Sequence, residues 1–168
     1  MSTTAGKFED RLDGAAFWEA WVASRITRTI KGASVTLMSV GEAKDVTVYP
    51  DMELFIADYS DDDWGGRTLG LEVKSRNVSF TGVSDYPFPT INTCSKSYWE
   101  RTGHLGRQYL IVSQSTGNII WIPSWVEKHQ KVAMDNTRGQ QFDCMAVDTM
   151  EAKDWHDFVG FCHGQKVT

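Results

Sequence analysis

The chain has 168 residues, of which 41% are hydrophobic and 23% charged, so it can form about one domain with a sizeable core and leaves no room for a second catalytic module. No apolar run approaches the ~20 residues needed to cross a bilayer, which excludes a transmembrane helix. The net charge of −5 has the wrong sign for a protein that binds nucleic acid through its overall field, so such binding would need a local basic patch.

The N-terminal segment is predicted to form an amphipathic helix. From Phe8 onward, apolar residues recur at three- and four-residue intervals until about Gly32, which is the pattern of a helix with one buried face. Gly14 is a point at which this helix could break. The charged residues near the start leave no apolar central region for a signal peptide, and we therefore expect an unprocessed, intracellular protein of the cytoplasm.

A β-meander is predicted after this helix. Ala33 to Val40 and Val46 to Ala57 are rich in β-branched residues, although Pro50 interrupts the second run. Thr68 to Ser75 has the composition of a third strand. The turn-forming residues from Tyr59 to Gly66 predict a long hairpin connection between the second and third strands.

The middle of the chain is predicted to contain a loop, a short helix and a hairpin. Asn77 to Thr90 shows no hydrophobic period, and Asn92 is placed to cap a helix that ends at Gly103. Gln108 to Ser113 and Ile119 to Ile122 then form two strands joined by a tight turn.

Two helices are predicted in the C-terminal part. Ser124-x-x-Glu127 and Asp148-x-x-Glu151 have the spacing of helix capping boxes, and the last helix is expected to carry Trp155, Phe158, Val159 and Cys162. The three cysteines show no C-x-x-C spacing, so they are expected to be reduced thiols. The whole pattern predicts one mixed α/β domain over residues 1–168, with a core at about 8–123 and a helical extension at about 124–168.

One strand carries residues of chemical interest. Side chains alternate along a strand, so Glu72 and Lys74 share one face of the third strand while Val73 points to the other. Asp51 follows Pro50 in the second strand, and beside the third strand it would bring two carboxylates and an ammonium together. Carboxylates hold Mg²⁺, and an ammonium next to the metal-bound water can orient it or stabilise charge on a phosphate. This trio suits hydrolysis of a phosphodiester.

Pro50-Asp51 followed by Glu72-Val73-Lys74 resembles the motif of the PD-(D/E)XK nuclease superfamily, which includes many restriction enzymes, junction resolvases and phage nucleases. The resemblance implies a restriction-endonuclease-like α-β-β-β-α-β core. It also implies that Asp51, Glu72 and the Val73 carbonyl bind Mg²⁺, for which Mn²⁺ can substitute. Lys74 would position the attacking water or stabilise charge.

Many members of this superfamily add a carboxylate from the first helix. Glu19 is the expected one, because Val22, Ala23 and Ile26 place it beside the buried stripe, and Glu9 is the alternative. Structural roles remain open at the same positions. The Glu72 and Lys74 pair would suit a solvated strand face, Asp51 could cap a turn, and Glu19 could pair with a nearby arginine.

The segment from Glu72 to Arg107 is locally basic, with five basic residues against three acidic ones, a net of +2. Such residues contact phosphates and position a duplex without reading its sequence. Those expected to bind nucleic acid are Lys96, Arg76, Ser75, Arg101 and Arg107, although Lys96 would also suit a solvated helix face. Trp64, at the tip of the hairpin, is a further candidate for contact with DNA or a protein partner.

We therefore expect a Mg²⁺-dependent DNA endonuclease that acts on duplex or branched DNA. The resemblance to small phage or mobile-element nucleases favours a homodimer, because cutting two strands needs two sites, and a phage origin in a bacterial host. Two alternatives remain. One is a nuclease-fold module that binds nucleic acid or protein without cutting, and the other is RNA cleavage by the same chemistry. No motif of a nucleotide hydrolase, esterase or dehydrogenase is present in the sequence.

Overall fold

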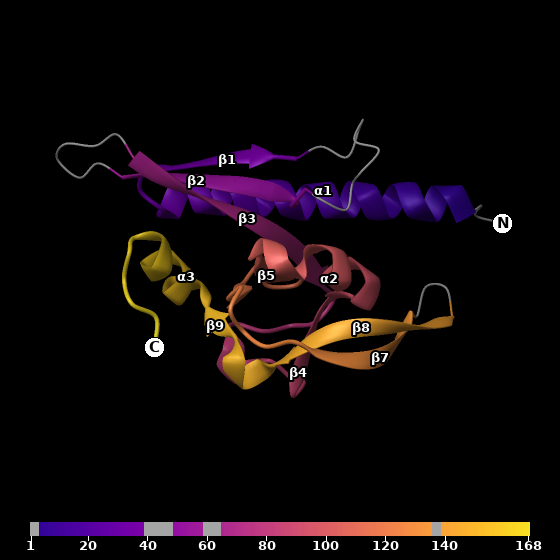
Figure 1. Cartoon of the computed structure of the whole chain (residues 1–168). Coiled ribbons are helices and arrows are strands. Elements are labelled where there is room, and N and C mark those ends of the chain that lie inside the picture. The colour runs from indigo at the N-terminus through magenta and orange to yellow at the C-terminus, as the bar shows by residue number, and fades with distance from the viewer. Residues whose placement is uncertain (1–3, 39–48, 59–64, 136–138) are drawn as a thin grey trace.

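The computed structural model describes residues 4–38, 49–58, 65–135 and 139–168 (Figure 1). The described helices are α1 (Thr4–Thr29), α2 (Lys96–Thr102) and α3 (Trp155–Cys162). Short 3₁₀ turns are η1 (Val83–Asp85), η2 (Gly103–Leu105) and η3 (Thr149–Glu151). The described strands are β1 (Ala33–Leu37), β2 (Met52–Asp58), β3 (Gly65–Arg76), β4 (Thr90–Ser95), β5 (Gln108–Ser113), β6 (Ile119–Ile122), β7 (His129–Asp135), β8 (Gln140–Asp148) and β9 (Lys153–Asp154).

The described strands form two sheets. The larger sheet has the order β1-β2-β3-β5-β6-β9, and the smaller one has the order β4-β8-β7. All pairings are antiparallel except that of β3 with β5, which run parallel with Glu72 opposite Tyr109. The result is a mixed sheet with helices, which confirms the predicted mixed α/β class. Strand β3 lies in the middle of the larger sheet.

Strand β5 shows why the sheet has a buried layer on each side. Its six residues are all buried, as expected for a central strand covered on both faces. Leu110 and Val112 point into a core shared with α1 and α3, while Tyr109 and Ile111 point into a second core that includes Ile91 of β4. The larger sheet therefore has helices α1 and α3 on one face and the smaller sheet on the other (Figure 1).

Most predicted elements of the first 123 residues are present. Helix α1 continues through Gly14 without a break. Strand β2 begins only after Pro50 and Asp51, because proline cannot donate to a ladder and tends to stand at strand ends. The β5–β6 hairpin has the predicted boundaries. The hairpin residues 59–64, with Trp64 at their end, lie outside the described residues.

The predicted cap of the short helix is wrong. Asn92 lies within β4, and the helix that follows is α2, which begins at Lys96. Its cap is Ser95, whose hydroxyl accepts a hydrogen bond from the backbone N–H of Tyr98 at 3.2 Å. The shift arises because residues 90–95 pair with β8, a long-range contact that overrides the local capping preference.

The first predicted C-terminal helix is also wrong. Ser124 to Glu127 form a turn, in which the Val126 N–H donates to the Pro123 carbonyl at 3.1 Å, and the chain continues into strands β7 and β8. At the second capping box, Asp148 caps only the short turn η3. The last helix starts later, with a capping box of its own formed by Asp154 and Asp157. That helix, α3, carries the predicted apolar residues.

The side chains of α1 are described from Gly14 onward. Val22 and Ile26 of this helix, and Ile30 directly after its end, are at most 2% exposed and share a core with residues of β2 and β3. Glu9 belongs to α1, but its side chain lies outside the described part. No helix among the described residues combines the length and the apolar character needed to span a bilayer.

Candidate active site

Three charged residues meet where β2 begins beside β3. Met52 pairs with Leu71, so Asp51, one residue earlier, lies next to Glu72. The ammonium of Lys74 is 3.2 Å from Glu72 Oε2 and 3.5 Å from Asp51 Oδ2. The structure therefore brings together the two carboxylates and the ammonium that the sequence placed on neighbouring strands.

The Asp51 carboxylate is held by the backbone of β3. The N–H of Val73 donates to Asp51 Oδ2 at 2.7 Å, a short bond of the kind formed with a charged acceptor. The Asp51 side chain keeps 25% of its surface exposed. The hydrogen bond to Oδ2 thus fixes the orientation of the Asp51 carboxylate, and part of the side chain remains exposed at the site.

Glu72 lies deeper, and besides Lys74 on Oε2 it has two partners on Oε1. It is 2% exposed, and its Oε1 accepts from Arg107 Nη1 at 2.5 Å and from the Tyr98 hydroxyl. Arg107 is itself 5% exposed. Burial, and then the bond to Glu72, raises the pKa of Tyr98, so its hydroxyl remains a donor. Arg107, which the sequence suggested for phosphate contact, lies in the interior as a partner of Glu72.

Glu19 of α1 lines the same cleft, here called the catalytic cleft because its residues are the candidates for catalysis. This cavity has a volume of about 250 Å³, and its lining residues are Ala15, Trp18, Glu19, Asp51, Val73, Lys74, Ser75 and Arg76. Burial, reinforced by the neighbouring Asp51 and Glu72 carboxylates and opposed by Lys74, raises the pKa of Glu19 from 4.5 to about 7. The helix carboxylate predicted from the sequence therefore does lie beside the strand residues.

Carboxylates and cations meet at the cleft, where Glu19 and Asp51 line it together with Lys74 and Arg76. Burial raises the pKa of Asp51, and Glu72 adds to this, while Lys74 and the Val73 N–H act in the opposite direction. Burial lowers the pKa of Lys74, but the Asp51 and Glu72 carboxylates outweigh it and the net shift is upward. Three carboxylates around one ammonium form an oxygen-rich site that a hard divalent cation would stabilise.

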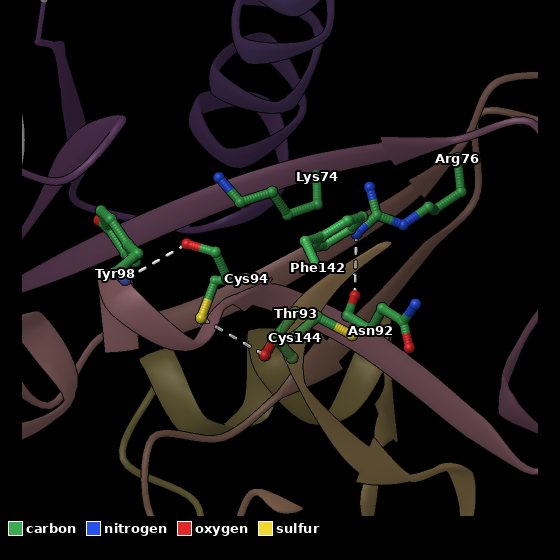
Figure 2. Close-up of a pocket in the computed structure, with 9 residues that line it drawn as sticks. Lys74, Arg76, Asn92, Thr93, Cys94, Tyr98, Phe142 and Cys144 are labelled. Carbon is green, nitrogen blue, oxygen red and sulfur yellow. Dashed lines mark hydrogen bonds between the residues drawn. The ribbon is translucent and has the colours of Figure 1, made fainter. Parts of the chain in front are cut away.

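A second cavity adjoins the first, and we call it the β4–β8 groove (Figure 2). It has a volume of about 440 Å³, and its lining residues are Lys74, Arg76, Asn92, Thr93, Cys94, Ser95, Tyr98, Phe142 and Cys144. Arg76 Nη2 donates to the Asn92 carbonyl at 2.9 Å and so links β3 to β4. Lys74 and Arg76 border both cavities. Sequence reasoning missed this groove, because its walls come from three separate segments.

Of the other residues predicted to contact nucleic acid, Ser75 lines a cavity, whereas Lys96 and Arg101 belong to helix α2. Ser75 lines the catalytic cleft and accepts from Gln114 Nε2 at 3.0 Å. Lys96 forms an i,i+4 ion pair with Glu100 at 3.6 Å, an ordinary arrangement for a helix surface. Arg101 is exposed in the last turn of α2.

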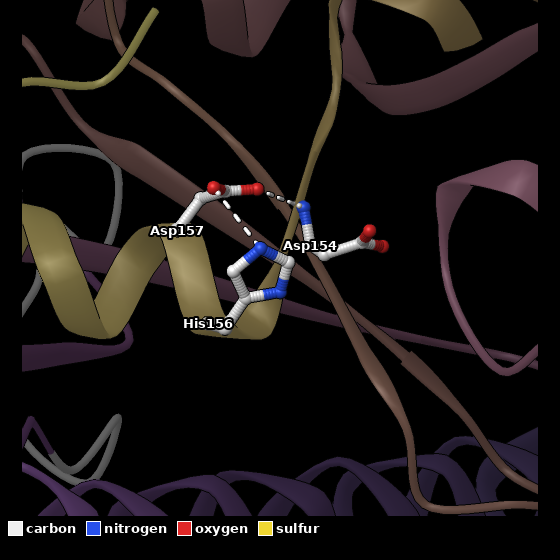
Figure 3. Close-up of side chains that lie close together, drawn as sticks. All are labelled: Asp154, His156 and Asp157. Atoms are coloured by element: carbon white, nitrogen blue, oxygen red, sulfur yellow. Dashed lines mark hydrogen bonds and ion pairs between the residues drawn. The ribbon is translucent and has the colours of Figure 1, made fainter.

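A cluster at the start of α3 has another explanation. The side chains of Asp154, His156 and Asp157 offer ligand atoms within 4.8 Å of one another (Figure 3). However, Asp154 Oδ1 accepts from the Val83 N–H at 2.7 Å, and Asp157 Oδ2 accepts from the Asp154 N–H at 3.1 Å. These bonds cap the helix and tie it to η1, so the cluster has a structural role.

The catalytic cleft is the place where the chain concentrates buried charge and shifted pKa values, which is typical of functional sites. No model of a protein family and no curated protein matches this chain. Function is therefore inferred from the residues and the geometry of the site.

Proposed function

We propose that the protein is a Mg²⁺-dependent nuclease of the PD-(D/E)XK type that hydrolyses phosphodiester bonds in DNA. The observation that carries this proposal is the convergence of Asp51, Glu72 and Glu19 on Lys74 at one cleft. Carboxylates that can hold a divalent cation, next to an ammonium that can stabilise charge on a phosphate, form the set required for metal-assisted hydrolysis.

The order of elements supports the proposal. Helix α1 is followed by the antiparallel strands β1, β2 and β3, then by α2 and the parallel strand β5. This is the order expected for a restriction-endonuclease-like core, with Asp51 directly before the second strand and Glu72 in the third. Strand β4 is inserted before α2 and pairs in the smaller sheet.

The oxygen atoms at the site are suitable ligands for Mg²⁺. Each carboxylate oxygen has about two lone-pair sites, so Glu72 Oε2 can accept its bond from Lys74 and still bind a cation, while Asp51, whose Oδ2 accepts from Val73 and Lys74, can offer Oδ1. Glu19 faces the same cleft, and the Val73 carbonyl is a further ligand by resemblance. A bound Mg²⁺ would act as a Lewis acid and lower the pKa of a coordinated water.

The protein's own groups have distinct tasks in this scheme. The Val73 N–H and the Arg107 guanidinium fix the two strand carboxylates before substrate arrives. Lys74 lies within 3.5 Å of both carboxylates, so its positive charge is next to the place where a phosphate would bind. There it can orient the attacking water and stabilise negative charge on the phosphate oxygens.

A binding module without cleavage is the second candidate. Both oxygens of Glu72 are engaged by neighbouring side chains, and the net charge of the chain is −5. If Glu72 stays locked to Arg107 and Lys74, the cleft would bind a phosphate through Lys74 and Arg76 without activating water. Cleavage assays separate the two candidates.

The test is incubation of the protein with supercoiled plasmid, branched duplex and single-stranded DNA, in Mg²⁺ or in EDTA, with Mn²⁺ as a second metal. Lys74→Ala and Asp51→Asn are the test variants. Lys166→Ala, which changes an exposed lysine near the C-terminus, is the control. We expect metal-dependent cleavage by the wild type and by Lys166→Ala, and none by the test variants. Binding without cleavage in every metal would favour the binding module.

A symmetric dimer remains a prediction that follows from this proposal, since cutting both strands of a duplex needs two sites. Light scattering on the purified protein measures its mass directly. A monomer that only nicks duplex DNA or cuts single strands would remove the need for a dimer and leave the proposed chemistry intact.

A further inference from the structure

The β4–β8 groove shares Lys74 and Arg76 with the catalytic cleft. The two cavities are therefore neighbours, separated only by the side chains at the end of β3. A polymer with one phosphate in the cleft can continue past these two cations into the groove. The groove volume of about 440 Å³ falls within the ~300–1,000 Å³ range of sites that take small ligands.

The walls of the groove differ in chemistry. Lys74 and Arg76 supply positive charge from β3, and Phe142 supplies an aromatic surface from β8. Phe142 is 40% exposed, and its cross-strand neighbour is the small residue Ala133, which leaves the ring uncovered. Figure 2 shows these side chains around the groove together with polar groups from β4 and α2.

Asn92 adds a hydrogen-bonding group. Within the described part of the chain, its side-chain oxygen is buried and has no hydrogen-bond partner. Buried polar atoms are nearly always paired, so a rotation of the Asn92 side chain that turns this oxygen toward the groove would let it accept an N–H group from a ligand. The exocyclic amines and ring N–H groups of nucleobases offer such donors.

We propose that the β4–β8 groove holds an unpaired nucleotide next to the scissile phosphate, with its base stacked on Phe142 and its phosphate facing Lys74 and Arg76. A positively charged groove with an aromatic platform is the usual arrangement for binding single strands. This inference rests on the proposed nuclease function, because that function places the scissile phosphate in the adjoining cleft.

The inference selects a class of substrate. In a continuous duplex each base is stacked and paired, so entry into the groove would require unstacking. A nucleotide in a single strand, a flap or a branch point is already unpaired. The preferred substrate is therefore DNA with an unpaired segment at the cleavage site, and continuous duplex is a poorer one.

Binding is tested with the full-length chain in EDTA, so that no cleavage occurs. The probe is a fluorescently labelled single-stranded oligonucleotide, and a duplex of the same sequence is measured in parallel. Phe142→Ala is the test variant and Phe142→Tyr retains the stacking ring. Met134→Ala is the control, because Met134 is 52% exposed and its pairing with Gln141 puts it on the opposite face of the β7–β8 hairpin.

Phe142→Ala is expected to weaken single-strand binding roughly fivefold or more, since stacking on an aromatic residue is worth that much per base. Phe142→Tyr and Met134→Ala are expected to bind like the wild type, and duplex binding should change little in any variant. Thermal melting confirms that each variant is folded. Unchanged single-strand affinity in folded Phe142→Ala, or an equal loss for duplex, would overturn the inference.

A cleavage assay on two substrates tests this inference separately from the proposed function. In Mg²⁺, the wild type is expected to cut a flapped substrate faster than the matched continuous duplex, and Phe142→Ala is expected to reduce that ratio. Equal cutting of both substrates, with no effect of the variant, would overturn the groove inference and leave the nuclease proposal standing. If nothing is cut but Phe142 still determines single-strand binding, the groove inference stands and the nuclease proposal fails.

Discussion

The two faces of strand β3 have opposite tasks. Leu71 and Val73 point toward α1 and are 0% and 8% exposed, whereas Glu72 and Lys74, in alternate positions, form an ion pair of which Lys74 lines the catalytic cleft. Strand β5, whose six residues are all buried, carries no charged residue and packs against a core on each face. The comparison shows how a site can be built on a rigid element: one face fixes the strand, and the charged side chains of the other face are thereby held in place.

Removing the buried cationic partner of Glu72 should have the largest effect. Arg107→Ala takes the guanidinium away from Glu72 Oε1 and leaves the buried carboxylate with Lys74 on its other oxygen, and breaking a buried pair in this way costs about 3–5 kcal/mol. Denaturant unfolding measures the loss. Arg101→Ala, on exposed α2, is the control and should change the free energy of unfolding by less than ~0.5 kcal/mol. Equal stability of both variants would mean that the charged face does not depend on this pair.

Shortening a side chain on the apolar face of β3 should lower the stability of the fold and leave metal binding at the site unchanged. Leu71→Ala creates a cavity beneath α1 and is expected to lower the free energy of unfolding by about 2–5 kcal/mol. The folded variant should still be stabilised by Mg²⁺, because the carboxylates on the other face are unchanged. Loss of that response in folded Leu71→Ala would show that the two faces are not separable.

Neutralising Asp51 should abolish metal binding and leave the fold intact. Mg²⁺ is expected to stabilise the wild type by up to about 2.7 kcal/mol when its concentration is about a hundredfold above Kd, and Asp51→Asn should lose this gain while folding normally. Thermal melting with and without Mg²⁺ measures it. Asp143→Asn, which changes an exposed carboxylate of β8, should respond like the wild type. A full metal response in Asp51→Asn would remove Asp51 from the ligand set.

The smallest effect concerns pH and Glu19. Folding raises the pKa of Glu19 from 4.5 to about 7. Protonation of this carboxyl group therefore stabilises the metal-free fold, fully so at a pH below 4.5. That stabilisation is lost as the pH rises through about 7. Glu19→Gln stays neutral throughout. In EDTA the variant should therefore gain stability relative to the wild type between about pH 5 and about pH 8. A difference that stays constant with pH would mean that burial in the cleft does not raise the pKa of Glu19.

The sequence predicts what depends on local patterns. Alternation along residues 68–75 was enough to put Glu72 and Lys74 on one face, and the apolar helix period was enough to place Glu19 on the side that meets them. Arg107 and Tyr98 could not be assigned to Glu72, because their contact is created by the packing of α2 and β5 against β3. Their sequence positions carry no pattern that signals this contact.

The smaller sheet was missed for a different physical reason. Val132, Met134 and Phe142 are all at least 40% exposed, so β7 and much of β8 lack the apolar alternation that marks a half-buried strand. A capping-box tetrapeptide at residues 124–127 then favoured a helix. Pairing of β8 with β4 stabilises these strands, and only that pairing brings Phe142 to the groove beside Lys74 and Arg76.

The most direct test of the central claim is the single-turnover cleavage rate of a labelled flapped duplex, with and without Mg²⁺, for the wild type and Lys74→Ala. Metal-dependent phosphodiester cleavage by the wild type, slower by about a hundredfold or more in the variant, is the predicted result, since loss of one charge-stabilising group has an effect of that order. Cleavage that needs no metal, or that proceeds equally fast without Lys74, would contradict the assignment of this cleft as a metal-dependent nuclease site.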